Sequence, residues 1–240
     1  MTPEEFAKKL REDLGDRVRS IVLYGSAAAG DYLEKGSDFN ILVVLDRLGL
    51  DELRRLVPAC RKWRREGNPP PLLFTAERLA RSCDVFPIEI LDIQEAHRVL
   101  WGEDVVANLP VARENLRHQL EYELKARLIQ LRQGYLDVEG KAKPLVQLLV
   151  RSLSSILVLA RAALRLTGGE APRDKMEALR RLAAHVDFAT RPFETVFRLK
   201  EGSLKPREVD AENLFAEYLH SVEQLADGID RWLETEIGRE

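Results

Sequence analysis

A glycine-serine turn followed by an acid and an amide is the segment of this sequence best suited to chemistry. Residues 24–30 read Tyr-Gly-Ser-Ala-Ala-Ala-Gly, and a Ser-Asp-Phe-Asn run follows shortly after. Gly25 would let a phosphate approach the backbone closely, and Ser26 can donate its hydroxyl beside the N–H groups of a helix start. Residues two apart on a strand face the same side, so Asp38 and Asn40 should both point toward a bound phosphate. The pattern predicts a phosphate-binding site.

The joint pattern of strand, Gly-Ser turn and Ser-Asp-x-Asn strand resembles the polymerase-beta-like nucleotidyltransferase superfamily. The resemblance implies that Gly25, Ser26 and Ser37 bind the phosphates of a nucleoside triphosphate. It also implies that Asp38, as a catalytic residue, and Asn40 hold Mg²⁺ or Mn²⁺ for an in-line displacement. The implied reaction transfers a nucleoside monophosphate to a hydroxyl acceptor and releases pyrophosphate. The alternative is an ordinary β-turn-α-β unit with a glycine-rich loop.

The C-terminal half resembles the helical domain of the kanamycin (aminoglycoside) nucleotidyltransferases. A bundle helix in that family carries Glu-Tyr-x-x-Lys, and residues 121–125 here read Glu-Tyr-Glu-Leu-Lys. The resemblance implies that Glu121 is the general base for the acceptor hydroxyl and that Lys125 contacts the nucleotide phosphates. The two residues are four apart and share a helix face. A surface ion pair is the alternative for both.

The sequence departs from the family pattern at the acids. Asn40 stands in place of the second carboxylate, and an amide oxygen can coordinate Mg²⁺ but brings no negative charge. One alignment places the third acid on a strand at residues 69–75, which contains none. A second alignment places it on an expected strand, Phe86–Leu91, and makes Glu89 the third metal ligand. A strand-end residue facing solvent is the alternative for Glu89.

Composition indicates a soluble globular protein. The 240 residues are 45% hydrophobic and 32% charged, with a net charge of −3, so no global basic field indicates nucleic-acid binding. The two cysteines, Cys60 and Cys83, cannot form a disulfide framework, and the charged N-terminus lacks an apolar signal core. We expect a cytoplasmic protein. Residues 145–166 are apolar but include three arginines, so we expect a bundle helix and no membrane span.

The predicted fold class is α+β. An N-terminal nucleotidyltransferase domain with a mixed sheet, residues 1–108, should precede a helical bundle, residues 109–240. The first domain should contain strands at 20–24, 38–45, 72–74 and 86–91, and helices at 3–14, 51–65, 76–82 and 94–100. The bundle should contain helices at 111–136, 144–167, 173–187, 191–201 and 208–236.

The bundle also predicts a two-fold homodimer. Residues 145–166 are apolar on nearly all faces, more than a bundle of this size would be expected to hide, and leftover apolar surface usually marks an interface. Relatives resembling kanamycin nucleotidyltransferase pair so that each site borrows residues from its partner's bundle. Glu121 and Lys125 should therefore lie near a shared cleft.

Two other functions are compatible with the sequence. The first is a catalytically degenerate nucleotide-binding or partner-binding module, because Asn40 weakens a two-metal site. The second is a ribonuclease or toxin-antitoxin component, because Arg180 and His185 fit a loose Arg-x4-His motif. A basic run at residues 54–65 could steer a polyanion such as tRNA, with a solvated helix face as the alternative.

Overall fold

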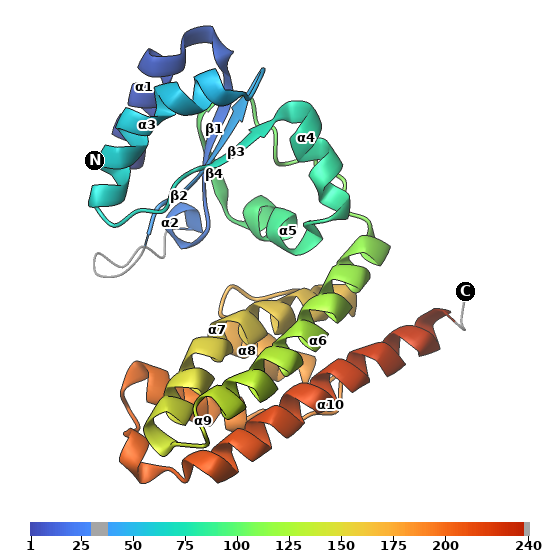
Figure 1. The fold of residues 1–240 in the computed structure, drawn as a ribbon. Coiled ribbons are helices and arrows are strands. Elements are labelled where there is room, and N and C mark those ends of the chain that lie inside the picture. The colour runs from blue at the N-terminus through green and yellow to red at the C-terminus, as the bar shows by residue number, and fades with distance from the viewer. Residues whose placement is uncertain (30–37, 238–240) are drawn as a thin grey trace. The chain divides into compact units, whose positions relative to one another are not determined.

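The chain forms two compact units, Met1–Ala112 and Arg113–Glu240. The computed structural model describes residues 1–29 and 38–237. The first unit combines a sheet with helices, and the second is built from helices, which together make an α+β protein (Figure 1). Each unit has its own architecture and core, and each is described in turn below.

The first unit is organised around a four-stranded mixed sheet. Its strand order is β3-β2-β1-β4. The central strand β1 runs antiparallel to both β2 and β4, whereas β3 runs parallel to β2. The strands span Val18–Tyr24 (β1), Asn40–Leu45 (β2), Leu72–Thr75 (β3) and His97–Gly102 (β4). The strands predicted at 20–24, 38–45 and 72–74 are therefore confirmed, with small shifts at their ends.

Helices cover both faces of the sheet, which explains the continuous apolar run of β2. Helices α1 (Pro3–Leu14) and α3 (Leu50–Arg65) pack on one face, where Ile41 and Val43 join their buried side chains. Helix α4 (Ala76–Arg81), helix α5 (Pro87–Glu95) and a short 3-10 turn between them lie on the other face, as Figure 1 shows. Successive β2 side chains thus enter two different cores, and both sets must be apolar.

Two assignments near the end of the first unit were wrong. The segment predicted as a strand at residues 86–91 is the start of α5, and the predicted helix at 94–100 largely gives way to β4. A short apolar run is ambiguous between a buried strand and a buried helix. Pro87 occupies the first helical turn, where proline is favoured, and Ile90 and Ile93 enter the core together. Glu89 therefore lies on a helix and is exposed.

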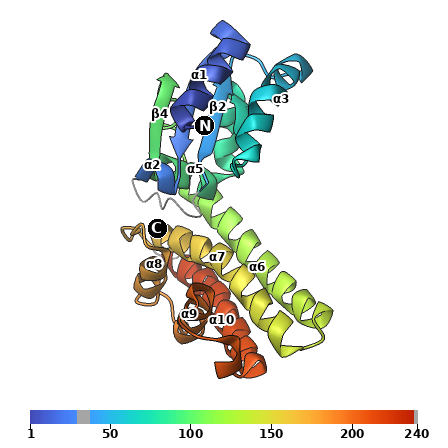
Figure 2. The same ribbon diagram turned by 90° about the vertical axis from the view of Figure 1, so that its left-hand side faces the viewer.

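The second unit is a helical bundle arranged around α7 (Ala142–Leu166). Helices α6 (Arg113–Asp137) and α10 (Ala211–Ile237) lie beside α7, and the shorter α8 (Lys175–Leu182) and α9 (Arg191–Glu201) complete its surroundings (Figure 2). The predicted helices are present, but the one expected at 173–187 ends at Leu182. The bundle core includes Tyr218, whose ring lies 4.9 Å from that of Phe193.

The apolar surface of α7 is covered within one chain. This helix is long and apolar enough to cross a membrane by length and composition, yet most of its leucines are buried, and α6, α8, α9 and α10 pack around it. The exposed large hydrophobic side chains of the described residues lie elsewhere, with none on α7. The expectation of leftover apolar surface on this helix was therefore wrong. Dimerisation loses that support and stays a prediction, which light scattering can test.

Candidate nucleotide and metal site

The Gly-Ser turn stands at the end of the central strand. Strand β1 ends at Tyr24, Gly25 turns the chain, and residues Ser26–Ala29 form one helical turn, α2. Gly25 adopts φ of +80°, a conformation that residues with a side chain rarely adopt, and its N–H donates to the Ala96 carbonyl over 2.8 Å. Ser26 is exposed immediately after the turn.

The start of β2 lies directly against this turn. A Cβ built on Gly25 would stand 3.5 Å from the Asn40 side-chain nitrogen, so the glycine and the amide are neighbours. Phe39 packs on the opposite side, with its ring centroid 6.0 Å from that of Trp63. Strand alternation then places Asp38 and Asn40 together on the face away from Phe39. Asp38 is exposed and available to solvent and ligands.

A polar row crosses the sheet at the same level. Tyr24 is paired with Asn40 on one side and with His97 on the other, so the three side chains share one face. Burial raises the pKa of Tyr24, which keeps its phenol neutral near pH 7. The His97 ring contacts the Gln94 carbonyl over 3.0 Å and an Asp104 carboxylate oxygen over 3.1 Å. Tyr24, Asn40 and His97 therefore form a polar row on the sheet face next to Asp38.

Asp104 anchors the outer end of that row. Its other carboxylate oxygen accepts the N–H groups of Val106 and Ala107, each over 3.1 Å. Burial by itself raises the pKa of Asp104, but the His97 hydrogen bond and the two backbone donors outweigh it and hold the pKa below its usual range. His97 thus has both ring nitrogens engaged and supports the strand end.

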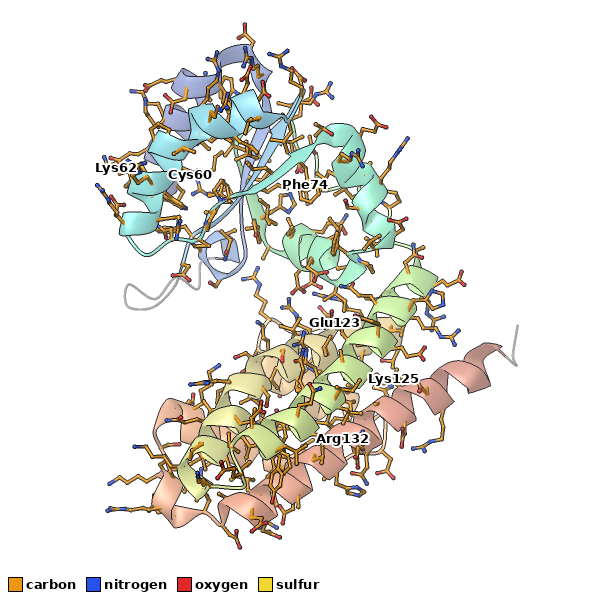
Figure 3. All side chains as sticks on the ribbon, in the orientation of Figure 1. Cys60, Lys62, Phe74, Glu123, Lys125 and Arg132 are labelled. Carbon is orange, nitrogen blue, oxygen red and sulfur yellow. The ribbon has the colours of Figure 1, made fainter. Side chains whose placement is uncertain are left out.

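In the described part of this turn and strand, the donors available for a metal are the Asp38 carboxylate and the Asn40 amide. Among the described residues, no group of three His, Cys, Asp or Glu side chains could hold a metal ion. Strand β3 lies beside β2 and precedes a Thr75-capped helix, as the first alignment requires, but it carries no acid. Leu72 and Phe74 stand on the Asn40 face instead, and Figure 3 labels Phe74 on β3. The Asp38 and Asn40 oxygens suit one Mg²⁺ completed by substrate phosphates and water.

The second unit carries a separate cluster on α6. Lys125 Nζ lies 2.5 Å from a Glu121 carboxylate oxygen and 3.4 Å from Asp230 of α10. Hydrogen bonding to Lys125 lowers the pKa of Glu121, and the same bond raises the pKa of Lys125. Lys125 is half exposed, and Figure 3 labels it on α6. The structure therefore joins the two sequence-predicted residues and adds a second acid.

Comparison with known proteins identifies the first unit. A family model described as "Nucleotidyltransferase domain" matches residues 3–94, the segment that contains the Gly-Ser turn and β2. Residues 3–94 are a nucleotidyltransferase domain. No curated protein matches the chain.

The whole chain also shares a fold with a solved nucleotidyltransferase. Spectinomycin adenyltransferase AAD(9) from Enterococcus faecialis, solved with ATP and spectinomycin, is similar at 12% identity with a TM-score of 0.57. The match covers 92% of this chain and 98% of that one, so the nucleotidyltransferase domain followed by a helical region is common to both. A toxin-antitoxin structure with AMP-PNP is 18% identical and covers 57% of this chain and 98% of its own, with a TM-score of 0.29.

The structure brings some of the predicted site residues together and leaves others apart or undescribed. Gly25, Ser26, Asp38 and Asn40 meet at one end of the sheet, whereas Ser37 lies outside the described residues. Glu89 stands on the first turn of α5, so the strand on which its expected role depended is absent. Its role as a metal ligand stays untested.

Sequence reasoning missed three residues beside these groups. Tyr24 and His97 join the Asn40 row only through strand pairing, and Asp230 reaches Lys125 only through helix packing. Local spacing gives no signal for these contacts, because the partner strands and the partner helix come from distant segments.

The two residues of the ribonuclease motif, Arg180 and His185, lie on α8 and in the turn that follows it. Arg180 on α8 donates to Glu194 over 3.0 Å and lies 3.9 Å from Glu177, so carboxylates already surround its guanidinium. His185 follows the end of that helix in a turn and is exposed. The pair therefore does not share a helix, and a ribonuclease role for it stays a prediction.

Proposed function

We propose that this protein transfers a nucleoside monophosphate from a nucleoside triphosphate to the hydroxyl group of a small acceptor. The acceptor oxygen forms a bond to the α-phosphorus, the bond from that phosphorus to the β-phosphate oxygen breaks, and pyrophosphate leaves. The observation that carries the proposal is the contact of the Gly25 turn with Asn40, inside the segment matched by the nucleotidyltransferase model.

The residues of the first unit would bind and orient the triphosphate. The backbone N–H groups that follow Gly25 and the Ser26 and Ser37 hydroxyls would supply donors for phosphate oxygens. Asp38 and Asn40 would hold Mg²⁺, which neutralises charge on the phosphates and on the leaving group. The neutral Tyr24 phenol and the His97–Asp104 pair would keep the strand ends fixed beside that position.

Glu121 and Lys125 would serve the acceptor and the phosphates. The Lys125 hydrogen bond lowers the pKa of Glu121 and makes this carboxylate a weaker base, so Glu121 would accept the acceptor proton once Lys125 has moved away. The half-exposed Lys125 ammonium can move to a phosphate when one binds. These assignments follow the family resemblance and rest on the observed pairing of the two side chains.

ATP is the triphosphate we propose, with a polyhydroxylated small molecule as acceptor. The support is the AAD(9) adenyltransferase, which shares this two-part fold and was solved with ATP and spectinomycin. A screen of hydroxylated compounds for ATP-dependent release of pyrophosphate would identify the acceptor.

The test of the nucleotide site is calorimetry with ATP and Mg²⁺. We expect Mg²⁺-dependent binding that Asp38→Ala weakens at least about tenfold, equivalent to about 1.4 kcal/mol, because the carboxylate of the metal pair is removed. Asp46→Ala, at the other end of β2, is the matched control and should bind like the natural protein. Binding that ignores both Mg²⁺ and Asp38→Ala would contradict the assignment.

A nucleotide-binding module without catalysis is the second candidate. It is favoured by Asn40 in place of an acid and by the absence of a carboxylate on β3 beside it. One acid and one amide hold less charge than a two-metal site needs. The two candidates differ in one measurement, pyrophosphate release, which the module would not show with any acceptor.

A further inference from the structure

The outer face of α3 carries a combination that the nucleotide site does not explain. We define the α3 face as three aliphatic and three basic side chains: Leu50, Leu53, Val57, Arg61, Arg64 and Arg65. Leu50 is 61%, Leu53 43% and Val57 50% exposed. Leu56, Ala59 and Trp63 bury the opposite side of the helix against the sheet. The buried side of α3 therefore does not account for Leu50, Leu53 and Val57, which remain exposed to solvent.

A groove continues the aliphatic row toward the end of the helix. It has a volume of about 590 Å³ and is lined by Val57, Cys60, Arg61, Arg64, Arg65 and Pro70. The wall opposite α3 is formed by Pro70, and its position is fixed because the buried Trp63 indole donates a hydrogen bond to the neighbouring Pro69 carbonyl over 2.9 Å. Figure 3 labels Cys60 and Lys62, which stand on different sides of α3: Cys60 lines this groove, and Lys62 faces α1. The groove is therefore preformed.

The arginines of this groove are not neutralised by acidic side chains among the described residues. Within the described residues, Arg61, Arg64 and Arg65 have neither an ion pair nor a side-chain hydrogen bond, in contrast to Arg17 and Arg47, which both pair with Glu52. Basic residues in a last turn do stabilise the negative end of a helix. That effect does not explain the exposed leucines and valine on the same face. An apolar row beside unpaired arginines is typical of a binding surface.

We propose that the α3 face binds an acidic amphipathic helix of a partner protein. Apolar side chains three and four residues apart on that helix would pack on Leu50, Leu53 and Val57 and enter the groove. Its Asp and Glu side chains would form bidentate pairs with the arginines. The face follows the 16 residues of α3, about 24 Å, which matches a partner helix of a few turns better than a small anion.

Other occupants fit these observations less well. Single-stranded RNA is held by basic residues interleaved with stacking aromatics, and every exposed apolar residue of the α3 face is aliphatic. A second copy of this chain offers another exposed apolar row in its described part, Tyr122, Ile129 and Leu136 on α6. Glu121 and Glu123 on that helix already pair with Lys125 and Arg127, so these carboxylates are not free to pair with the arginines of the α3 face.

The surface is separate from the proposed nucleotide site within the first unit. Helix α3 covers the sheet face that receives Phe39, whereas Asn40 belongs to the other face. Partner binding and Mg²⁺-dependent ATP binding can therefore be measured independently, and either can fail alone.

The test is fluorescence anisotropy with a labelled peptide as long as α3, built as a helix with leucines on one face and glutamates beside them. We expect it to bind the full chain at least about tenfold more tightly than a peptide of the same composition in scrambled order. Arg61→Glu should weaken binding at least about tenfold, and Val57→Gln should also weaken it. Arg55→Glu is the matched control, since Arg55 lies on the same helix outside the α3 face, and it should change little.

Several outcomes would overturn the proposal. They are equal binding of ordered and scrambled peptides, equal loss with Arg55→Glu and Arg61→Glu, and no binding of either peptide. Tighter binding of a single-stranded RNA or of phosphatidylserine vesicles than of the ordered peptide would assign the surface to that partner instead. Circular dichroism of each variant confirms that α3 stays folded.

Discussion

At the residue scale, the amide at position 40 decides what the site can do. Asn40 lies against the Gly25 turn, where the family pattern has a second acid, and the neighbouring strand supplies no carboxylate in its place. An amide oxygen binds Mg²⁺ without neutralising its charge. Among the described residues of this turn, Asp38 supplies the carboxylate, so the charge at position 40 is the variable that we expect to separate a transferase from a binding module.

Restoring the acid at position 40 separates the two candidate functions. If the site is a transferase with a weakened metal pair, Asn40→Asp should tighten Mn²⁺ or Mg²⁺ binding several-fold, because a second charge joins Asp38. Any release of pyrophosphate should rise with it. Calorimetry and a pyrophosphate assay measure the two effects. Loss of nucleotide binding in Asn40→Asp would instead show that the amide is needed to bind the ligand, which would support the binding module without catalysis.

A side chain at Gly25 should damage the same site by crowding Asn40, while both proposed metal donors stay in the chain. Gly25→Ala places a Cβ in the left-handed region at φ of +80°, which costs about 1–2 kcal/mol, and fills the space beside Asn40. We expect a lower thermal midpoint and weaker binding of ATP. Gly67→Ala is the matched control, because Gly67 has φ of +91° with nothing within 4 Å of its Cβ position. It should lose stability but bind ATP normally.

At the element scale, one buried carboxylate fixes the start of α3. Glu52 is 2% exposed, and it accepts hydrogen bonds from Arg17, Arg47 and the Gly49 N–H over 3.0–3.1 Å. These contacts tie the first turn of α3 to the loop after β2 and to the start of β1. The α3 face therefore depends on this residue for its position, although Glu52 is not part of it.

The Glu52 contacts predict a pH-dependent stability. Burial alone raises the pKa of Glu52, but the Gly49 N–H and the Arg47 guanidinium outweigh it and hold the pKa below its usual range. A carboxyl whose pKa is lower in the folded state stabilises the fold above its unfolded pKa, and this contribution is lost as the pH falls through the folded value. Glu52→Gln should therefore unfold at a lower urea concentration at pH 7. The difference should shrink as the pH falls below about 4; a gap independent of pH would contradict this account.

At the scale of the whole molecule, each unit has the interior of an independent domain. The sheet of Met1–Ala112 has a core on each face, and the bundle of Arg113–Glu240 has its own core around α7. The nucleotide site and the α3 face both belong to the first unit. The proposed base, Glu121, belongs to the second.

This division predicts that the first unit folds alone. A fragment of residues 1–112 should show a cooperative thermal transition and bind Mg-ATP, because its sheet and both covering helix layers are complete. It should not release pyrophosphate, since Glu121 is absent. Circular dichroism and calorimetry measure the first two properties. A fragment without a cooperative transition would show that the bundle is needed for folding.

The sequence by itself determined the parts that depend on near neighbours. The Gly25–Ser26 turn, the shared face of Asp38 and Asn40, and the helices of the bundle follow from spacing and periodicity within a few residues. The position and pairing of Glu121 and Lys125 on α6 follow for the same reason, because four residues span one helical turn.

Only the tertiary structure decided the features that join distant segments. The run at residues 86–91 fits a strand or a helix locally, and packing of Ile90 and Ile93 against the sheet selects the helix. Strand pairing brings His97 into the Asn40 row, and helix packing brings Asp230 to Lys125. The apolar α7 looked exposed from its own sequence because the helices that cover it come from elsewhere in the chain. Burial is a property of the whole packed chain, and local spacing does not contain it.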